Sequence, residues 1–217
     1  MMGLIKGSIG FLDMTSWWLD ELSYKERETI LSVYNPIGNS SDNLINGDVI
    51  STTEEPISLL YGIAGWLNSH EHIELCIKLY TKAKSLINAN TTAINVHLLH
   101  NSEIISYYKH RLHIGLEPTI TACEDQIKIA DEAAHEFMLD YQEQLNFARE
   151  RNIDISLDNC SVLPSHRGYK QLSIIFSNSN QYQRAIDLCR QAHMQGWSGD
   201  WDKRIERYKK KAGKVTG

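Results

Sequence analysis

Histidine is the residue type in this chain that could most readily do chemistry as a metal ligand. The sequence contains nine histidines, and four lie in one stretch with helical periodicity. They are His97, His100, His110 and His113. A Glu132-x-x-His135 pair resembles half of a di-iron site, but such a site needs two of these pairs and two further glutamates. No zinc set with three ligands completes the histidines. The sequence therefore predicts no bound metal and no cofactor, and the histidines are expected to be solvated or hydrogen-bonded.

Sequence motifs for nucleophilic or nucleotide chemistry are missing. The chain has no Gly-x-Ser-x-Gly elbow, no phosphate-binding glycine loop and no dinucleotide fingerprint. Cys160 and His166 are close in sequence, but such a pair occurs often by chance. We therefore expect no catalytic residues. A metal-dependent enzyme that uses the histidine-rich helix stays open as a less favoured alternative.

Composition and charge are those of a soluble globular protein. The net charge of -5 provides no broad basic field, which argues against nucleic acid as the partner. The four cysteines are far apart in sequence, without a Cys-x-x-Cys pair, which argues against a zinc cage or a disulfide framework and favours a reducing cytoplasm. The longest uncharged apolar segment, 57–67, is too short to cross a bilayer. We expect a cytoplasmic protein that does not bind membranes.

The spacing of apolar residues, with only four prolines, predicts an all-α fold and a single domain over 1–217. A loop rich in Asn, Ser, Gly and Asp is expected at 35–56. The expected helical elements are an N-terminal helix at 15–34, hairpin 1 at 57–87, hairpin 2 at 95–130 whose second helix continues to about 151 (as one helix or two nearly continuous ones), hairpin 3 at 164–197, and a C-terminal capping helix at 198–212.

The same spacing predicts which helix faces are buried. In the helix that begins near 95, the residues expected to face the core are Leu98, Ile105, Tyr108 and Leu112. Gly62 and Gly65 lower helix propensity, so another helix is expected to pack closely against them. Arg204, in the capping helix, is expected to face water.

A short pattern, Ile-x-[Leu/Ala]-Cys, occurs three times and ends at Cys76, Cys123 and Cys189. Each copy falls on the second helix of its predicted hairpin. Equivalent positions suggest shared packing, so these cysteines are expected to be small core residues rather than nucleophiles or ligands. Their unequal spacing predicts irregular insertions between the hairpins.

The stretch 164–197 resembles the tetratricopeptide repeat family, whose unit is a helix-turn-helix pair of about 34 residues. The residues that carry the resemblance are Tyr169, Leu172, Ser173, Phe176, Tyr182, Ala185 and Ala192. Cys189 stands where the family prefers Phe, and Trp197 where it often has Pro. The resemblance implies stacked helical hairpins in a right-handed array.

In that family, the first helix of each hairpin lines a concave groove that holds a peptide or a partner helix. Hairpin 3 would contribute Arg167, Lys170, Ile174, Ser177 and Asn178, and hairpin 2, by a weaker alignment, Ser102, Ser106, Lys109 and His110. These residues form a modestly basic set, which fits an acidic segment or a terminal carboxylate. We expect a protein- or peptide-binding scaffold. The alternative is a homo-oligomeric structural protein, such as a homodimer.

Overall fold

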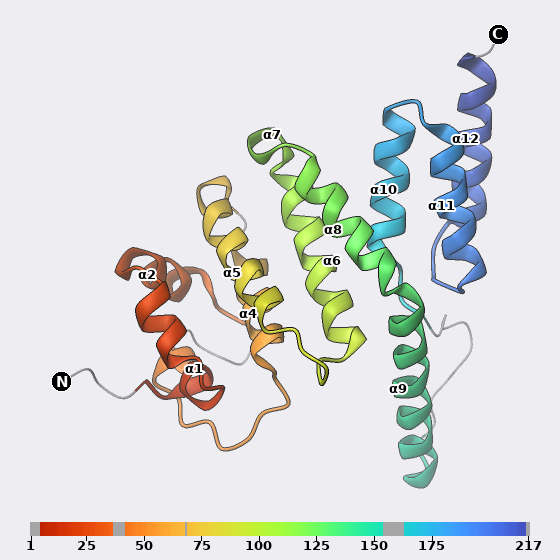
Figure 1. The fold of residues 1–217 in the computed structure, drawn as a ribbon. Coiled ribbons are helices and arrows are strands. Elements are labelled where there is room, and N and C mark those ends of the chain that lie inside the picture. Colours follow the sequence, from red (N-terminus) through yellow and green to blue (C-terminus); the bar gives the residue numbers. More distant parts are fainter. Residues whose placement is uncertain (1–4, 37–41, 68, 154–162, 216–217) are drawn as a thin grey trace. The chain divides into compact units, whose positions relative to one another are not determined.

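Helices make up almost all of the regular structure in this chain (Figure 1). The computed structural model describes residues 5–36, 42–67, 69–153 and 163–215. Within these ranges there is no β-strand, and a single parallel bridge joins Ser165 to Ser198. The all-α prediction is confirmed. Among the described helices, none combines the length and hydropathy needed to span a membrane.

The chain divides into two compact units, Met1–Asn90 (unit 1) and Thr91–Gly217 (unit 2). The single domain expected over 1–217 stays a prediction. The helices of unit 1 are α1 (Gly7–Phe11), the π-helix η1 (Trp17–Glu21), α2 (Tyr24–Val33), α3 (Asp42–Ile45), α4 (Pro56–Trp66), the 3-10 helix η2 (His70–His72) and α5 (Ile73–Ser85). α4 packs against α5, as predicted for hairpin 1, and α1 packs against α3, a short helix inside the expected loop.

The helix expected over 15–34 is interrupted, which corrects the prediction. Ser23 begins α2 with a capping box: its Oγ accepts a hydrogen bond from the Glu26 amide (3.3 Å), and its own amide donates to Glu26 Oε2 (2.7 Å). Arg27 Nη1 donates to three carbonyls at the end of η1, at 2.8 to 3.1 Å. A Ser-x-x-Glu start signal within the expected helix therefore separates it into two.

The described part of unit 2 contains two helical hairpins and three further helices. Its helices are α6 (Ala93–Lys109), α7 (Arg111–Ile114), α8 (Glu117–Lys128), α9 (Ala130–Glu150), α10 (Arg167–Asn178), α11 (Tyr182–Met194) and α12 (Trp201–Val215). α6 pairs with α8 and α10 pairs with α11, while α10 also packs against α8 and α12 against α11. The long predicted helix is two helices that meet at Ile129, where acidic residues in the first turn of α9 favour a new start.

The three repeated cysteines lie in the interior, as predicted, and each has 0% of its surface exposed. The close approach expected at Gly62 and Gly65 is wrong, because a Cβ atom added to either glycine would meet nothing within 4 Å. Arg204 is buried rather than solvated, and its Nε donates to Asp200 Oδ1 at 2.6 Å.

The buried face of α6 differs from the predicted one. Leu98 and Ile105 are 37% and 45% exposed, and Leu112, which lies on α7, is 88% exposed. The buried residues of α6 are Ala93, His97, Leu99, His100, Glu103, Ile104 and Tyr107. Apolar residues occur all around this helix, so their spacing does not select one face, and the neighbouring helices decide which side is covered.

Candidate binding site between α8 and α11

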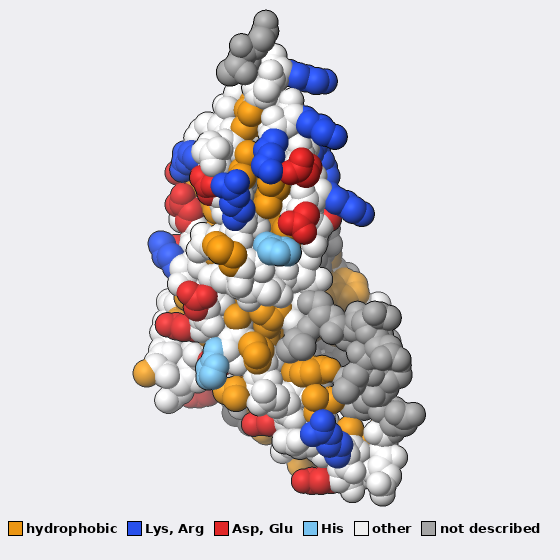
Figure 2. Space-filling view, turned by 90° about the vertical axis from the view of Figure 1, so that its right-hand side faces the viewer, with side chains coloured by type: hydrophobic (Ala, Val, Ile, Leu, Met, Phe, Trp, Pro, Cys, Tyr) orange, Lys and Arg blue, Asp and Glu red, His pale blue; other side chains and the backbone are white. Residues whose placement is uncertain are grey.

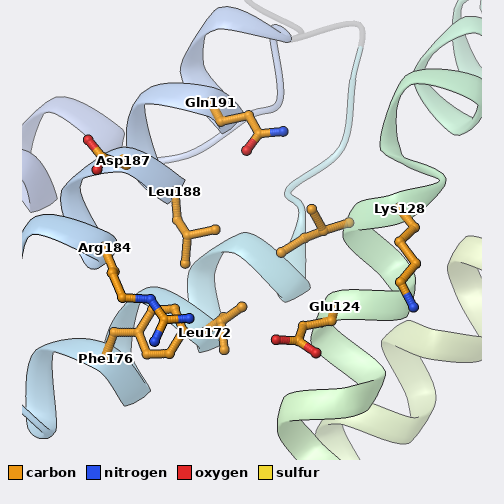
Figure 3. A pocket seen from close by; sticks show the side chains of 9 residues that line it. Glu124, Lys128, Leu172, Phe176, Arg184, Asp187, Leu188 and Gln191 are labelled. Atoms are coloured by element: carbon orange, nitrogen blue, oxygen red, sulfur yellow. The ribbon is translucent and has the colours of Figure 1, made fainter. Parts of the chain in front are cut away.

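An open hollow of about 470 Å³ lies in unit 2 between α8 and α11, and α10 forms its floor (Figure 3). The floor consists of the buried side chains of Leu172 and Phe176. Ile127 from α8 and Leu188 from α11 add partly exposed apolar surface. Figure 3 shows Leu172, Phe176 and Leu188 directed toward the same space. The apolar surface that the hollow exposes therefore comes mainly from Ile127 and Leu188, beside a buried floor.

Charged side chains form the two rims of the hollow. On α11, the guanidinium of Arg184 lies over the Phe176 ring, 3.9 Å from its centroid, and Arg184 Nη1 donates to the neutral amide oxygen of Gln181 at 2.6 Å. On α8, Lys128 donates to Asp125 at 2.7 Å, and this hydrogen bond raises the pKa of Lys128. Arg184 thus keeps a positive charge that no carboxylate among the described residues neutralises.

Of the two carboxylates on the rims, one is paired with a neighbouring cation and the other is not. Asp187 is engaged with Arg190 at 3.2 Å and with Gln183 at 2.8 Å. Glu124, across the hollow on α8, makes no hydrogen bond or ion pair with the residues that the structure describes. The hollow can therefore bind an apolar side chain whose polar neighbours meet Arg184 on one side and Glu124 on the other.

A buried glutamine joins the helices that form the floor of the hollow. Gln126 Nε2 donates to the carbonyl of His97 at 2.9 Å, and its Oε1 accepts from the Gly168 amide at 2.6 Å. A side chain at position 168 would not fit, because an added Cβ would lie 2.8 Å from the Cys123 carbonyl oxygen. His166 caps α10, since its Nδ1 accepts from the Tyr169 amide at 3.3 Å. These contacts fix α10 against α6 and α8.

Two histidines belong to a buried aromatic cluster rather than to solvent. His97 stacks on Trp197, with centroids 5.1 Å apart and planes at 5°, and His166 lies edge-on to both rings at 5.0 and 4.7 Å. Burial lowers the pKa of His97 to about 4 and that of His166 to about 3, and each is lowered further by a neighbouring histidine. Both rings are therefore neutral at pH 7.

The other side chains that the sequence offers as candidate metal ligands lie in several different environments. His100 is buried, with its Nδ1 2.7 Å from Glu103 Oε2, whereas His113 is exposed. Glu132 and His135 are both exposed on α9. In the part of the chain that the structure describes, no three or more His, Cys, Asp or Glu side chains are arranged to hold a metal ion. Cys160 lies outside the described residues.

The residues predicted to line a basic groove on α6 and α10 differ in exposure. Lys109, Lys170 and Asn178 are exposed, Ser102, Ser106, Arg167 and Ile174 are partly exposed, and His110 and Ser177 are buried. The structure does bring α6 and α10 together, because Arg167 Nε donates to Asn101 Oδ1 at 3.0 Å. Ser177 Oγ instead accepts from Lys211 Nζ at 3.3 Å. His110 and Ser177 are closed off from an open groove, and partner binding by the others stays a prediction.

The hollow uses residues that the sequence analysis did not select. From the sequence, Leu172 and Phe176 are only residues that carry the resemblance to the repeat family, and every groove residue predicted in hairpin 3 lies on its first helix. A signal was present in α11, where Arg184, Leu188 and Gln191 share one helical face away from the buried Cys189.

No protein-family model matches this chain, and neither the curated proteins nor the solved structures contain a significant match.

Proposed function

We propose that unit 2 is a protein- or peptide-binding scaffold of tetratricopeptide-like hairpins, α6 with α8 and α10 with α11. The partner segment lies in the hollow between α8 and α11. The observation that supports this proposal is the open hollow itself, where the partly exposed side chains of Ile127 and Leu188 lie beside the buried Leu172 and Phe176. Apolar surface that is rimmed by charge is a common property of interaction sites.

The chemistry of the hollow indicates what the partner segment carries. Burying an apolar side chain on this floor contributes about 25 cal/mol for each Å² of apolar surface removed from water. The guanidinium of Arg184 lies over Phe176, and its unused N–H groups suit a carboxylate that accepts two hydrogen bonds. We therefore expect a segment with a large apolar residue next to an acidic side chain or a terminal carboxylate.

A peptide library displayed on phage and selected on the full chain tests this proposal. The selected peptide is synthesised with a fluorophore, and its affinity is measured by anisotropy. Arg184→Glu and Leu188→Asn should each weaken binding roughly tenfold or more, which corresponds to about 1.4 kcal/mol. Arg149→Glu is the charge-matched control, because Arg149 is exposed on α9 and lies outside the hollow. Unchanged affinity in both hollow variants would refute the assignment.

The same peptide distinguishes the hollow from the basic face predicted on α6 and α10. Lys170→Glu combined with Lys109→Glu reverses two exposed charges of that face and alters no residue of the hollow. We expect this double variant to bind the peptide as the native chain does, with unchanged helicity. If it loses binding while Arg184→Glu keeps it, the partner site is the basic face and not the hollow.

A further inference from the structure

The outer face of α9 carries an acidic stripe. α9 contains six acidic residues and one basic residue, for a net charge of -5. Glu132, Leu139, Glu143 and Glu150 recur at intervals of seven, four and seven residues, which places them on one line along the helix. All four are exposed. The three glutamates make no ion pair with any residue that the structure describes.

The outer face of α12 carries the opposite charge. α12 contains seven basic and two acidic residues, for a net charge of +5. Lys203, Arg207, Lys210 and Lys214 follow one another at intervals of four, three and four residues and are all exposed. Figure 2 shows Lys and Arg side chains gathered over the upper part of this surface, where α12 lies. Asp202 and Glu206 lie beside this stripe, but of its four cations only Arg207 forms an ion pair among the described residues, 3.6 Å from Asp200.

The two stripes cannot pair within one molecule. In Figure 1 the distal end of α9 and the C-terminal end of α12 point to opposite ends of unit 2. The stripe on α9 is the longer one, since Glu132 and Glu150 are eighteen residues apart whereas Lys203 and Lys214 are eleven apart, so the basic stripe can lie along part of the acidic one. Eleven residues correspond to about 16 Å of helix. We propose that the chain associates with a second copy of itself, with α12 of one copy lying along α9 of the other.

Apolar surface beside each stripe completes the interface. On α9, Met138, Leu139 and Phe147 are 46%, 46% and 53% exposed. On the other side, a hollow of about 380 Å³ between α11 and α12 contains Met194, which is 78% exposed, and Ile205. An exposed ion pair contributes only about 0 to 1 kcal/mol, so the charges select the orientation while the apolar contacts add affinity. The association is therefore weak and sensitive to salt.

Sedimentation velocity of the full chain over a concentration series tests this self-association. The native chain should associate in about 0.05 M NaCl and largely dissociate in about 0.5 M NaCl, which shortens the Debye length about threefold. An acidic variant changes Lys203, Lys210 and Lys214 to Glu, and a basic variant changes Glu132, Glu143 and Glu150 to Lys. Each variant should be monomeric alone, and an equimolar mixture of the two should associate again because opposite charges then face each other.

A control variant changes the same number of exposed lysines elsewhere, Lys25, Lys84 and Lys170, to Glu. It should associate as the native chain does, which separates the stripe on α12 from a general effect of net charge. Circular dichroism checks that all variants remain helical. A native chain that stays monomeric at low salt would overturn the proposal, as would two charge variants that do not associate when mixed. This self-association does not depend on the hollow between α8 and α11.

Discussion

Lowering the pH to about 5 should destabilise unit 2 through the buried imidazoles of His97 and His166. Burial holds the pKa of His97 at about 4 and that of His166 at about 3, below the ordinary value of 6.5. The titratable groups that face these rings are each other, His100, and Tyr169, whose pKa burial raises to about 12. No carboxylate contributes to the lowered pKa of either ring.

The direction of the effect follows from where the protons bind first. The folded-state pKa of each imidazole lies below its unfolded-state value, so the unfolded chain takes up protons first as the pH falls. The stabilising contribution of the two neutral imidazoles is fully present above about pH 7, and it is lost progressively as the pH falls toward their folded-state pKa values. Each ring lowers the free energy of unfolding by about 1.4 kcal/mol for every pH unit below its unfolded-state pKa. At pH 5 the loss is roughly 2 kcal/mol for each ring and about 4 kcal/mol for both. That is a large part of a typical free energy of unfolding of about 5 to 15 kcal/mol.

The assay is hydrogen exchange, followed by mass spectrometry on peptides from α6 and α10 at increasing urea concentrations. It reports the free energy of unfolding of unit 2 by itself. His97→Phe keeps an aromatic ring against Trp197, and it gives up no hydrogen bond at Nδ1, which has no partner among the residues that the structure describes. In this variant, the free energy of unfolding should fall roughly half as much between about pH 6.5 and 5 as it does in the native chain. The control is His135→Gln, which alters an exposed histidine on α9 and should leave this pH dependence unchanged.

Two outcomes would refute this reasoning. One is a native chain whose unit 2 has the same free energy of unfolding at both pH values. The other is a His97→Phe variant whose pH dependence equals that of the native chain. The pKa values of Glu26, Asp200 and Glu206 are lowered by their hydrogen bonds, but these carboxyls lose their stabilising effect only below about pH 4.5. The measured interval therefore isolates the imidazoles.

Further predictions concern the packing of unit 2 and the reactivity of the buried thiols of both units. Gly168→Ala should lower the free energy of unfolding by about 1 to 3 kcal/mol in urea titrations, because the new methyl meets the Cys123 carbonyl. Gly213→Ala, an exposed position on α12 where a Cβ meets nothing within 4 Å, should raise it by about 1 kcal/mol or less. Burial raises the pKa of Cys123 to about 12 and also raises that of Cys189. A thiol reagent with peptide mapping should therefore label Cys76, Cys123 and Cys189 in urea but not in the native chain; rapid labelling of the native chain would contradict this burial.

The amino-acid sequence by itself determined the helices, their pairing into hairpins and the burial of the repeated cysteines. These features depend on contacts between residues near each other in sequence, so the spacing of apolar residues predicts them. The hairpin 164–197 is the clearest case, because Tyr169, Leu172 and Cys189 are all buried as their spacing predicts. Helix boundaries are harder to predict. The Ser-x-x-Glu signal at Ser23 is present in the sequence, but the apolar spacing continues across it and predicts one longer helix.

Only the tertiary structure decided which side of α6 is buried and where an apolar floor stays open. His97 is covered by Trp197 and His166, which follow it in sequence by 69 residues or more. The hollow exists because α8 and α11 lie on either side of α10 without meeting above Leu172 and Phe176. The periodicity of a single helix records that a face is apolar, but whether another helix covers that face depends on packing between distant segments.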